Sequence, residues 1–164
     1  MKSDLPKVCH PLCGKPLIGH VLDAVAQLSP AQVIVIVGHR AATVREACDG
    51  HPIEFATQEP QLGTAHAVLQ AMPILGKDWT HVLVVSGDVP LVRASSLQKL
   101  VAVHDRTGAA VTVLTALLED PCHYGRMIRG ENGDVVRIVE QKDATPAEAA
   151  VREVNTGTYV FDRA

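Results

Sequence analysis

Two runs of β-branched residues set the strongest limit on what this chain can fold into. Residues 32–38 read QVIVIVG, and residues 81–86 read HVLVVS. The first run is apolar at successive positions, which is typical of a strand that is covered on both faces inside a parallel sheet. The second run has the same character and ends abruptly in a turn. The sequence therefore predicts buried strands with helices packed against them.

Helical patterns alternate with strands through the first two thirds of the chain. We expect strands at residues 32–38, 53–57, 81–86 and 109–117, and helices at residues 15–28, 41–50, 64–72 and 95–105. Thr64, and either Ser95 or Ser96, are suited to cap the helices that they begin. This alternation predicts an α/β fold with a mostly parallel sheet flanked by helices.

The pattern changes after Asp120. Residues 125–141 form two alternating runs joined around Asn132 and Gly133, which is a hairpin signal. A short helix at residues 145–150 and a last strand at residues 154–161 follow. We expect a small antiparallel flap attached to the parallel sheet, placed where it can cover a substrate.

Composition narrows the class of protein. The 164 residues are 47% hydrophobic, which suits a single domain over residues 1–164, and the formal net charge of -3 gives no basic footprint for nucleic acid. No apolar run approaches the ~20 residues of a membrane span, and the first residues lack a signal-peptide core. We therefore expect a cytoplasmic protein that acts on small molecules.

The four cysteines are expected to be small buried hydrophobic residues and not disulfide partners. They stand at positions 9, 13, 48 and 122. The stretch CHPLC, residues 9–13, resembles half of a zinc site, but no second Cys or His pair with suitable spacing follows.

Three places carry candidate chemistry, and each also has a simpler interpretation. Asp88 follows a strand, where it is either a turn residue or a metal ligand, since ligands bind outside the carboxyl ends of such strands. Lys7 stands on a stiff segment after Pro6 and either contacts phosphate or is solvated. Gly63 and Thr64 begin a helix, whose free N–H groups suit a phosphate or a base edge, or form an ordinary cap.

Six motifs, in order, resemble a known family. They are SDLPKV, QEPQLGTAHAV, SGDVPL, YGRMIR, IVEQKDAT and EVNTGTYVF. In sequence and spacing they are similar to the N-terminal uridyltransferase domain of bacterial bifunctional N-acetylglucosamine-1-phosphate uridyltransferases, and the resemblance covers residues 2–161. It implies a Rossmann-like nucleotide-diphospho-sugar transferase fold. It also implies an enzyme that joins UTP and N-acetylglucosamine 1-phosphate into UDP-N-acetylglucosamine, releases pyrophosphate and uses Mg²⁺.

The resemblance assigns a role to each matching position. Lys7 is implied to be catalytic and to contact phosphate, and Asp88 to ligate Mg²⁺. The remaining positions are implied to contact the uracil (Gln58, Gly63 and Thr64), the ribose and sugar (Ser86 and Gly87) and the N-acetylglucosamine moiety (Gly125, Glu140 and Asn155). Without the family, Glu140 reads as a surface charge and Asn155 as a strand-end amide.

The chain also departs from the family pattern. The family has a first strand and a glycine-rich LAAGxGTRM loop before the matching segment, and an asparagine Mg²⁺ ligand and an acetyltransferase domain after it. We therefore expect an inactive fragment of such an enzyme, whose parent forms a homotrimer through the absent domain. The alternatives are another sugar-1-phosphate nucleotidyltransferase and a noncatalytic truncated paralogue. The family's first strand lies inside the sheet, so its neighbours, expected near residues 33–37 and 82–85, would each have a bare edge.

Overall fold

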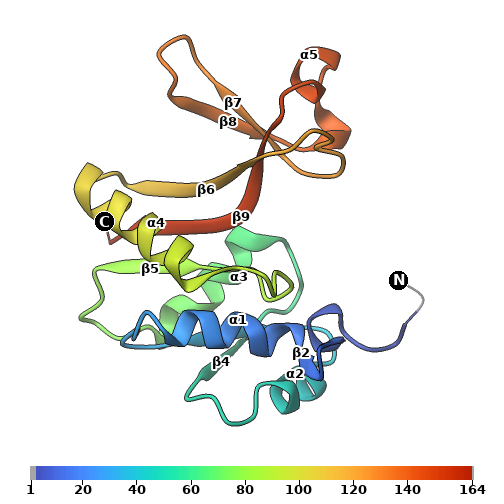
Figure 1. The fold of residues 1–164 in the computed structure, drawn as a ribbon. Coiled ribbons are helices and arrows are strands. Elements are labelled where there is room, and N and C mark those ends of the chain that lie inside the picture. Colours follow the sequence, from blue (N-terminus) through green and yellow to red (C-terminus); the bar gives the residue numbers. More distant parts are fainter. Residues whose placement is uncertain (1–2, 164) are drawn as a thin grey trace.

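The computed structural model describes residues 3–163, and Figure 1 shows their arrangement. The α-helices are α1 (Leu17–Ala26), α2 (Ala41–Ala47), α3 (Thr64–Ala71), α4 (Ala94–Thr107) and α5 (Pro146–Ala149), and the short 3-10 helices are η1 (Lys7–Cys9), η2 (Met72–Ile74) and η3 (Gln141–Asp143). The strands are β1 (Pro11–Leu12), β2 (Lys15–Pro16), β3 (Ile34–Val37), β4 (Glu54–Thr57), β5 (His81–Val84), β6 (Val111–Leu117), β7 (Arg126–Arg129), β8 (Val135–Val139) and β9 (Glu153–Asp162). Every element expected from the sequence is present, and the α/β class is confirmed.

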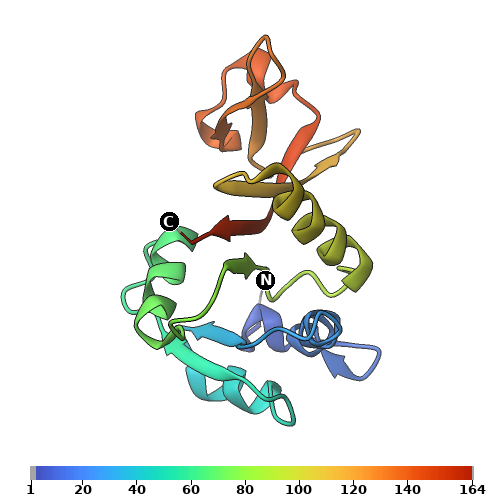
Figure 2. The same cartoon turned by 90° about the vertical axis from the view of Figure 1, so that its left-hand side faces the viewer.

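The first layer joins β3 and β4 to helices α1 and α2. The two strands run parallel, with Ile34 opposite Glu54 and Val37 opposite Thr57. Apolar residues from both helices meet β3 in one buried cluster, formed by Cys9, Ile18, Leu22, Val35, Val37, Val44 and Cys48. The β-branched run of β3 therefore packs against both helices in the core of the first layer. The strand lies in the lower part of Figure 2.

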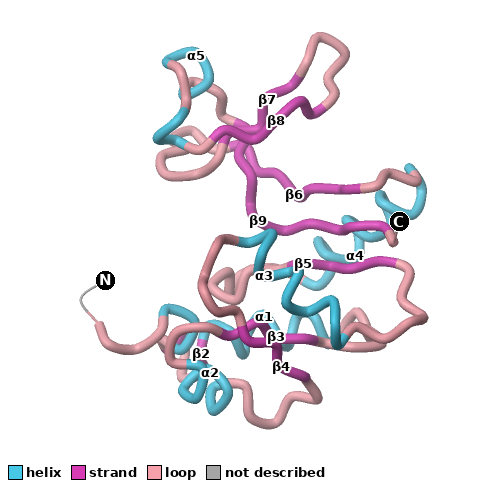
Figure 3. The backbone as a smooth tube through the Cα atoms, turned by 180° about the vertical axis from the view of Figure 1, so that it is seen from behind, coloured by secondary structure: helices cyan, strands magenta, loops and turns pink. Residues whose placement is uncertain are grey.

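The second layer is a five-stranded sheet built around β9. Strand β9 pairs antiparallel with β5, β6 and β7, and β7 pairs antiparallel with β8. Only β3 and β4 form a parallel pair among the described residues, so the sheets are more antiparallel than the sequence suggests. The reason is that β9 returns to lie between β5 and β6, and this long-range pairing leaves no mark on the local sequence (Figure 3).

A cavity of about 1310 Å³ separates the two layers, and β3, β5, α1 and α3 contribute to its lining. Within residues 3–163, β3 pairs only with β4, and β5 pairs only with β9. Strands β3 and β5 run in the same direction. At their starts, the side chain of Gln32, before β3, accepts a hydrogen bond from the backbone N–H of Gly76, which precedes β5. At their ends, the residues that follow β3 and β5 contact the segment containing Asp4 and Lys7. The two bare edges therefore border a gap, as expected.

The flap consists of the β7–β8 hairpin, η3 and α5, which lie together beyond β9 in Figure 1. Helix α5 starts with a capping box, in which Thr145 accepts from the backbone N–H of Glu148 and the Glu148 carboxylate accepts from Thr145. The expected caps of the earlier helices are wrong. Gly63 precedes α3 and Arg93 precedes α4, and neither helix has a side-chain cap.

The cysteines divide into two pairs. Cys9 and Cys48 are buried as expected, whereas Cys13 and Cys122 are exposed, so the expectation is wrong for these two. Cys13 lies in the turn between β1 and β2, a small hairpin that the sequence analysis missed, and adopts a positive φ of 51°. No helix within residues 3–163 is long and apolar enough to cross a membrane.

Candidate active site

Lys7 and Asp88 meet at the carboxyl end of β5. The Lys7 Nζ lies 2.6 Å from the Asp88 Oδ2, and the lysine side chain is 62% exposed while that of the aspartate is 29% exposed. This hydrogen bond and the negative charge of Asp88 raise the pKa of Lys7 above its usual range. The rigid approach expected from Pro6 is present, because Pro6 leads directly into η1. The two residues therefore form a charged pair that is open to solvent.

Gln58 organises the loop between β4 and α3. The side chain is buried, and its Nε2 donates a 2.9 Å hydrogen bond to the carbonyl oxygen of Gly63 and lies 3.1 Å from the Nδ1 of His66. Gly63 has a φ of 97°, a value that favours glycine, and Thr64 is the first residue of α3. The loop is thereby held at the amino end of α3.

The three expected residues of the flap also come together. The backbone N–H of Asn155 donates to the carbonyl oxygen of Gly125 at 2.8 Å, and a Cβ at position 125 would lie 3.3 Å from the Oε1 of Glu140. The Asn155 side chain is held as well, since its Oδ1 accepts from the N–H of Gly157 and its Nδ2 lies 2.6 Å from the Tyr159 hydroxyl. Residues 30 positions apart thus form one cluster.

Ser86 lies against β9, and the adjacent Gly87 lies against the segment that carries Lys7. A Cβ at Gly157, which has a φ of 75°, would lie only 3.1 Å from the Oγ of Ser86, while one at Gly87 would lie 3.3 Å from the side chain of Val8. Both glycines therefore permit close approach of neighbouring segments. Six of the expected residues, Lys7, Gln58, Gly63, Thr64, Ser86 and Gly87, line the large cavity.

The structure adds two residues that the sequence analysis missed. Gln61 lines the same cavity and lies against Gly38, where a Cβ would come within 2.2 Å of the Gln61 Nε2. The phenol of Tyr124 is close enough to contribute to the raised pKa of Lys7. Their positions in the sequence could have indicated these two residues. Gln61 lies in the loop between Gln58 and Gly63, and Tyr124 precedes Gly125.

The donor set at Asp88 fits Mg²⁺ better than it fits zinc. Mg²⁺ prefers oxygen ligands and is commonly held by one or two carboxylates together with substrate phosphates. Asp88 offers a partly exposed carboxylate at a strand end, and Lys7 contacts its Oδ2. Within residues 3–163, the one group of three or more His, Cys, Asp or Glu side chains spaced for a metal contains His81, which begins β5, and not Asp88.

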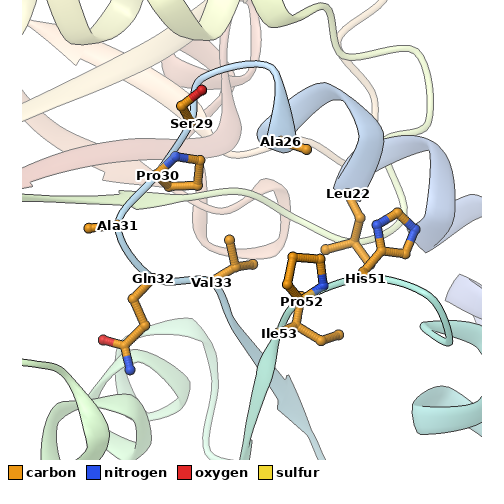
Figure 4. A pocket seen from close by; sticks show the side chains of 10 residues that line it. All are labelled: Leu22, Ala26, Ser29, Pro30, Ala31, Gln32, Val33, His51, Pro52 and Ile53. Atoms are coloured by element: carbon orange, nitrogen blue, oxygen red, sulfur yellow. The ribbon is translucent and has the colours of Figure 1, made fainter.

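A second hollow lies at the other end of β3 and β4. It measures about 310 Å³ and is bordered by residues that precede these strands, including Val33 and Ile53, together with the end of α1 (Figure 4). Its lining residues include His51 and Gln32 but none of the expected site residues. We therefore place the candidate active site at the cavity between β3 and β5.

Comparison with known proteins shows the family of the chain. The family model described as "MobA-like NTP transferase domain" matches residues 1–148. The chain belongs to this family. Two proteins named "Bifunctional protein GlmU", from Bacillus licheniformis and Bacillus cereus (strain AH187), are each 51% identical to it over 162 residues. The match covers 99% of this chain but 35% of each relative, so the chain spans about a third of their length. The resemblance to the N-terminal part of these bifunctional proteins is confirmed.

Solved structures of low sequence identity share this fold. HddC from Yersinia pseudotuberculosis, complexed with GMP-PN, has a TM-score of 0.75 at 17% identity, and the match covers 99% of this chain and 69% of that one. CMP:2-keto-3-deoxy-manno-octonic acid synthetase complexed with CTP has a TM-score of 0.74 at 19% identity, with 98% and 69% covered. At these identities the likeness supports the fold alone.

Proposed function

We propose that this chain is the part of a uridyltransferase that joins UTP and N-acetylglucosamine 1-phosphate into UDP-N-acetylglucosamine, with release of pyrophosphate. The observation that carries the proposal is the convergence of residues between positions 7 and 155. Six of them line one cavity, Asp88 pairs with Lys7, and three form the flap cluster, although the ten residues come from six separate segments. The similarity to two proteins named bifunctional protein GlmU supports the same reaction.

The proposed chemistry is in-line displacement at the α-phosphorus of the nucleotide by the phosphate of the sugar. Such a reaction depends on positioning and on compensation of charge more than on proton transfer. Lys7 supplies a positive charge on a stiff segment, and its hydrogen bond to Asp88 raises the pKa of its ammonium group above the usual range. Asp88 would hold Mg²⁺, which neutralises phosphate charge when bound.

The two other groups of residues would fix the ends of the substrates. Gln58 uses its amide nitrogen to hold the Gly63 carbonyl, and its Oε1 would accept a hydrogen bond from the uracil edge. Glu140 and Asn155 offer a carboxylate and an amide, which suit the hydroxyl groups of the sugar, and Gly125 permits the close approach of Glu140. The flap would thereby bind the sugar beside the nucleotide.

Two other functions remain as candidates. Another sugar-1-phosphate nucleotidyltransferase would use the same Lys7 and Asp88 with a different base or sugar. A noncatalytic paralogue would bind nucleotide without turnover. The homotrimeric assembly of the parent enzyme stays a prediction, as does a cytoplasmic location.

The test is pyrophosphate release by the full-length protein that contains this chain, measured with each pairing of a nucleoside triphosphate and a sugar 1-phosphate. We expect Mg²⁺-dependent release that is greatest with UTP and N-acetylglucosamine 1-phosphate. Preference for another pair would assign the chain to a different nucleotidyltransferase, and nucleotide binding without release would favour the paralogue. A polypeptide of these 164 residues alone is expected to be inactive, because β3 and β5, which border the cavity, each have an unpaired edge within residues 3–163.

A further inference from the structure

A group of histidine and carboxylate side chains lies at the opposite end of β5 from Asp88. His81 begins β5, His104 lies in the last turn of α4, and Asp162 ends β9. One potential ligand atom from each lies within 4.8 Å of the others. None of these three residues is among the expected site residues, although His81 also borders one end of the large cavity.

His104 is held so that one ring nitrogen remains for a ligand. The residue is 1% exposed, and its Nδ1 lies 2.8 Å from the Oγ1 of Thr112 on β6. Its ring meets that of His81 edge to face, with the two centroids 4.8 Å apart. Since Thr112 occupies Nδ1, Nε2 is the nitrogen left to bind another group.

His81 has a complementary arrangement. Its Nε2 lies 2.8 Å from the Oδ1 of Asp105. Its Nδ1 is buried, lies 3.2 Å from the Oδ1 of Asp162, and has no hydrogen-bond partner within the described residues. A buried polar atom without a partner is costly, so the position of this nitrogen calls for a ligand.

We propose that His81 Nδ1, His104 Nε2 and a carboxylate oxygen of Asp162 bind a divalent transition metal of the zinc type. Imidazole and carboxylate groups suit Zn²⁺, and metal-binding histidines usually have their second ring nitrogen held by a carboxylate or another acceptor. Here Asp105 holds the second ring nitrogen of His81, and Thr112 holds that of His104. Water would complete a tetrahedral site. Small side-chain movements are needed, because the ligand atoms are up to 4.8 Å apart.

The metal would act as a structural link. It would join β5, β9 and α4 at the end of the sheet that faces away from Lys7 and Asp88. This site is separate from the proposed Mg²⁺ position and does not depend on the proposed uridyltransferase reaction. Its failure would therefore leave that proposal unaffected, and the reverse also holds.

Cobalt provides a direct test, since Co²⁺ replaces Zn²⁺ and is visible by absorption. The intact protein is stripped with a chelator and titrated with Co²⁺, and the complex is then challenged with Zn²⁺. We expect the visible bands of tetrahedral Co²⁺ at one equivalent, displacement by Zn²⁺, and a higher melting temperature with metal. An absence of these bands would overturn the proposal. So would a sulfur-to-cobalt charge-transfer band, which would indicate a cysteine site.

Variants assign the ligands. Asp162→Asn and His81→Gln each remove a proposed ligand and should weaken Co²⁺ binding by about 100-fold. Asp105→Asn changes a residue that only orients His81 and should weaken binding by about tenfold. Asp162 is half exposed, so Asp162→Asn tests the site even if His104→Gln disturbs folding. His39→Gln, at an exposed histidine, is the control and should bind as the parent does. Equal affinity in Asp162→Asn, His81→Gln and the parent would refute the assignment.

Discussion

The proposed reaction depends most on the carboxylate of Asp88. We expect Asp88→Asn in the intact protein to lower Mg²⁺-dependent turnover by about 100-fold or more, because an amide cannot replace the charge that holds the metal. The measurement is pyrophosphate release at saturating Mg²⁺. Asp23→Asn is a matched control, since Asp23 also forms an ion pair with a lysine, Lys15, away from the cavity. Near-parental turnover in Asp88→Asn would rule out the metal assignment.

Gln58 gives a prediction about nucleotide choice. Gln58→Ala removes a buried amide that holds the Gly63 carbonyl, and an unpaired polar group costs about 1–3 kcal/mol. We therefore expect a smaller ratio of kcat/KM for UTP over CTP. Gln70→Ala is the control, because Gln70 contacts the other ring nitrogen of His66 on the far side from Gln58. An unchanged ratio in Gln58→Ala would remove this residue from base recognition.

The buried Cys48 gives a prediction about pH. Burial raises the pKa of its thiol from 9.0 to about 11. Between these values the unfolded chain loses the proton while the folded chain keeps it, so the free energy of unfolding falls as pH rises from about 9 to about 11. A fall of roughly 1–3 kcal/mol is expected from urea unfolding. The fall should be smaller in Cys48→Ala than in the parent, whereas Cys13→Ala, at an exposed thiol, should leave it unchanged.

At the scale of the elements, β9 carries the main constraint. Gly157 lies where the register with β6 shifts, has a φ of 75° and faces Ser86. Gly157→Ala should lower the free energy of unfolding by roughly 1–2 kcal/mol and raise KM for the sugar phosphate, because Ala tolerates this φ poorly and would press on Ser86. Gly76→Ala, whose Cβ would meet nothing closer than 4.0 Å, is the control. Equal stability of the two variants would contradict the prediction.

The same elements show how far local sequence leads. The apolar runs of β3 and β5 and the stripe of α1 were predictable, since burial and helical periodicity leave a direct trace in residue order. The position of β9 between β5 and β6 was not, because strand pairing between distant segments is decided by tertiary packing. Lys7 and Asp88 had plausible simpler roles, and only the family resemblance and their 2.6 Å contact favour a site. Gln61 was missed because nothing local marks a glutamine that lies against Gly38.

At the scale of the whole molecule, the cavity between β3 and β5 dominates the expected behaviour. Each strand leaves one edge unpaired within residues 3–163, and bare β-branched edges recruit other chains. We expect the isolated 164-residue polypeptide to aggregate or to remain partly unfolded. Size-exclusion elution and urea unfolding of this polypeptide provide the test. A monomer with one cooperative transition would show that the two layers are stable without a strand between them.

The place of β9 in the chain has a consequence for biosynthesis. It spans Glu153–Asp162 and pairs with β5, β6 and β7, all of which leave the ribosome earlier. Until β9 has emerged, β5 and β6 lack the partner that holds them side by side, and pairing over such separations is slow. A nascent chain would therefore present two unfinished apolar strands for the time needed to translate about 40 more residues after β6. During that interval these strands are natural binding sites for a ribosome-associated chaperone.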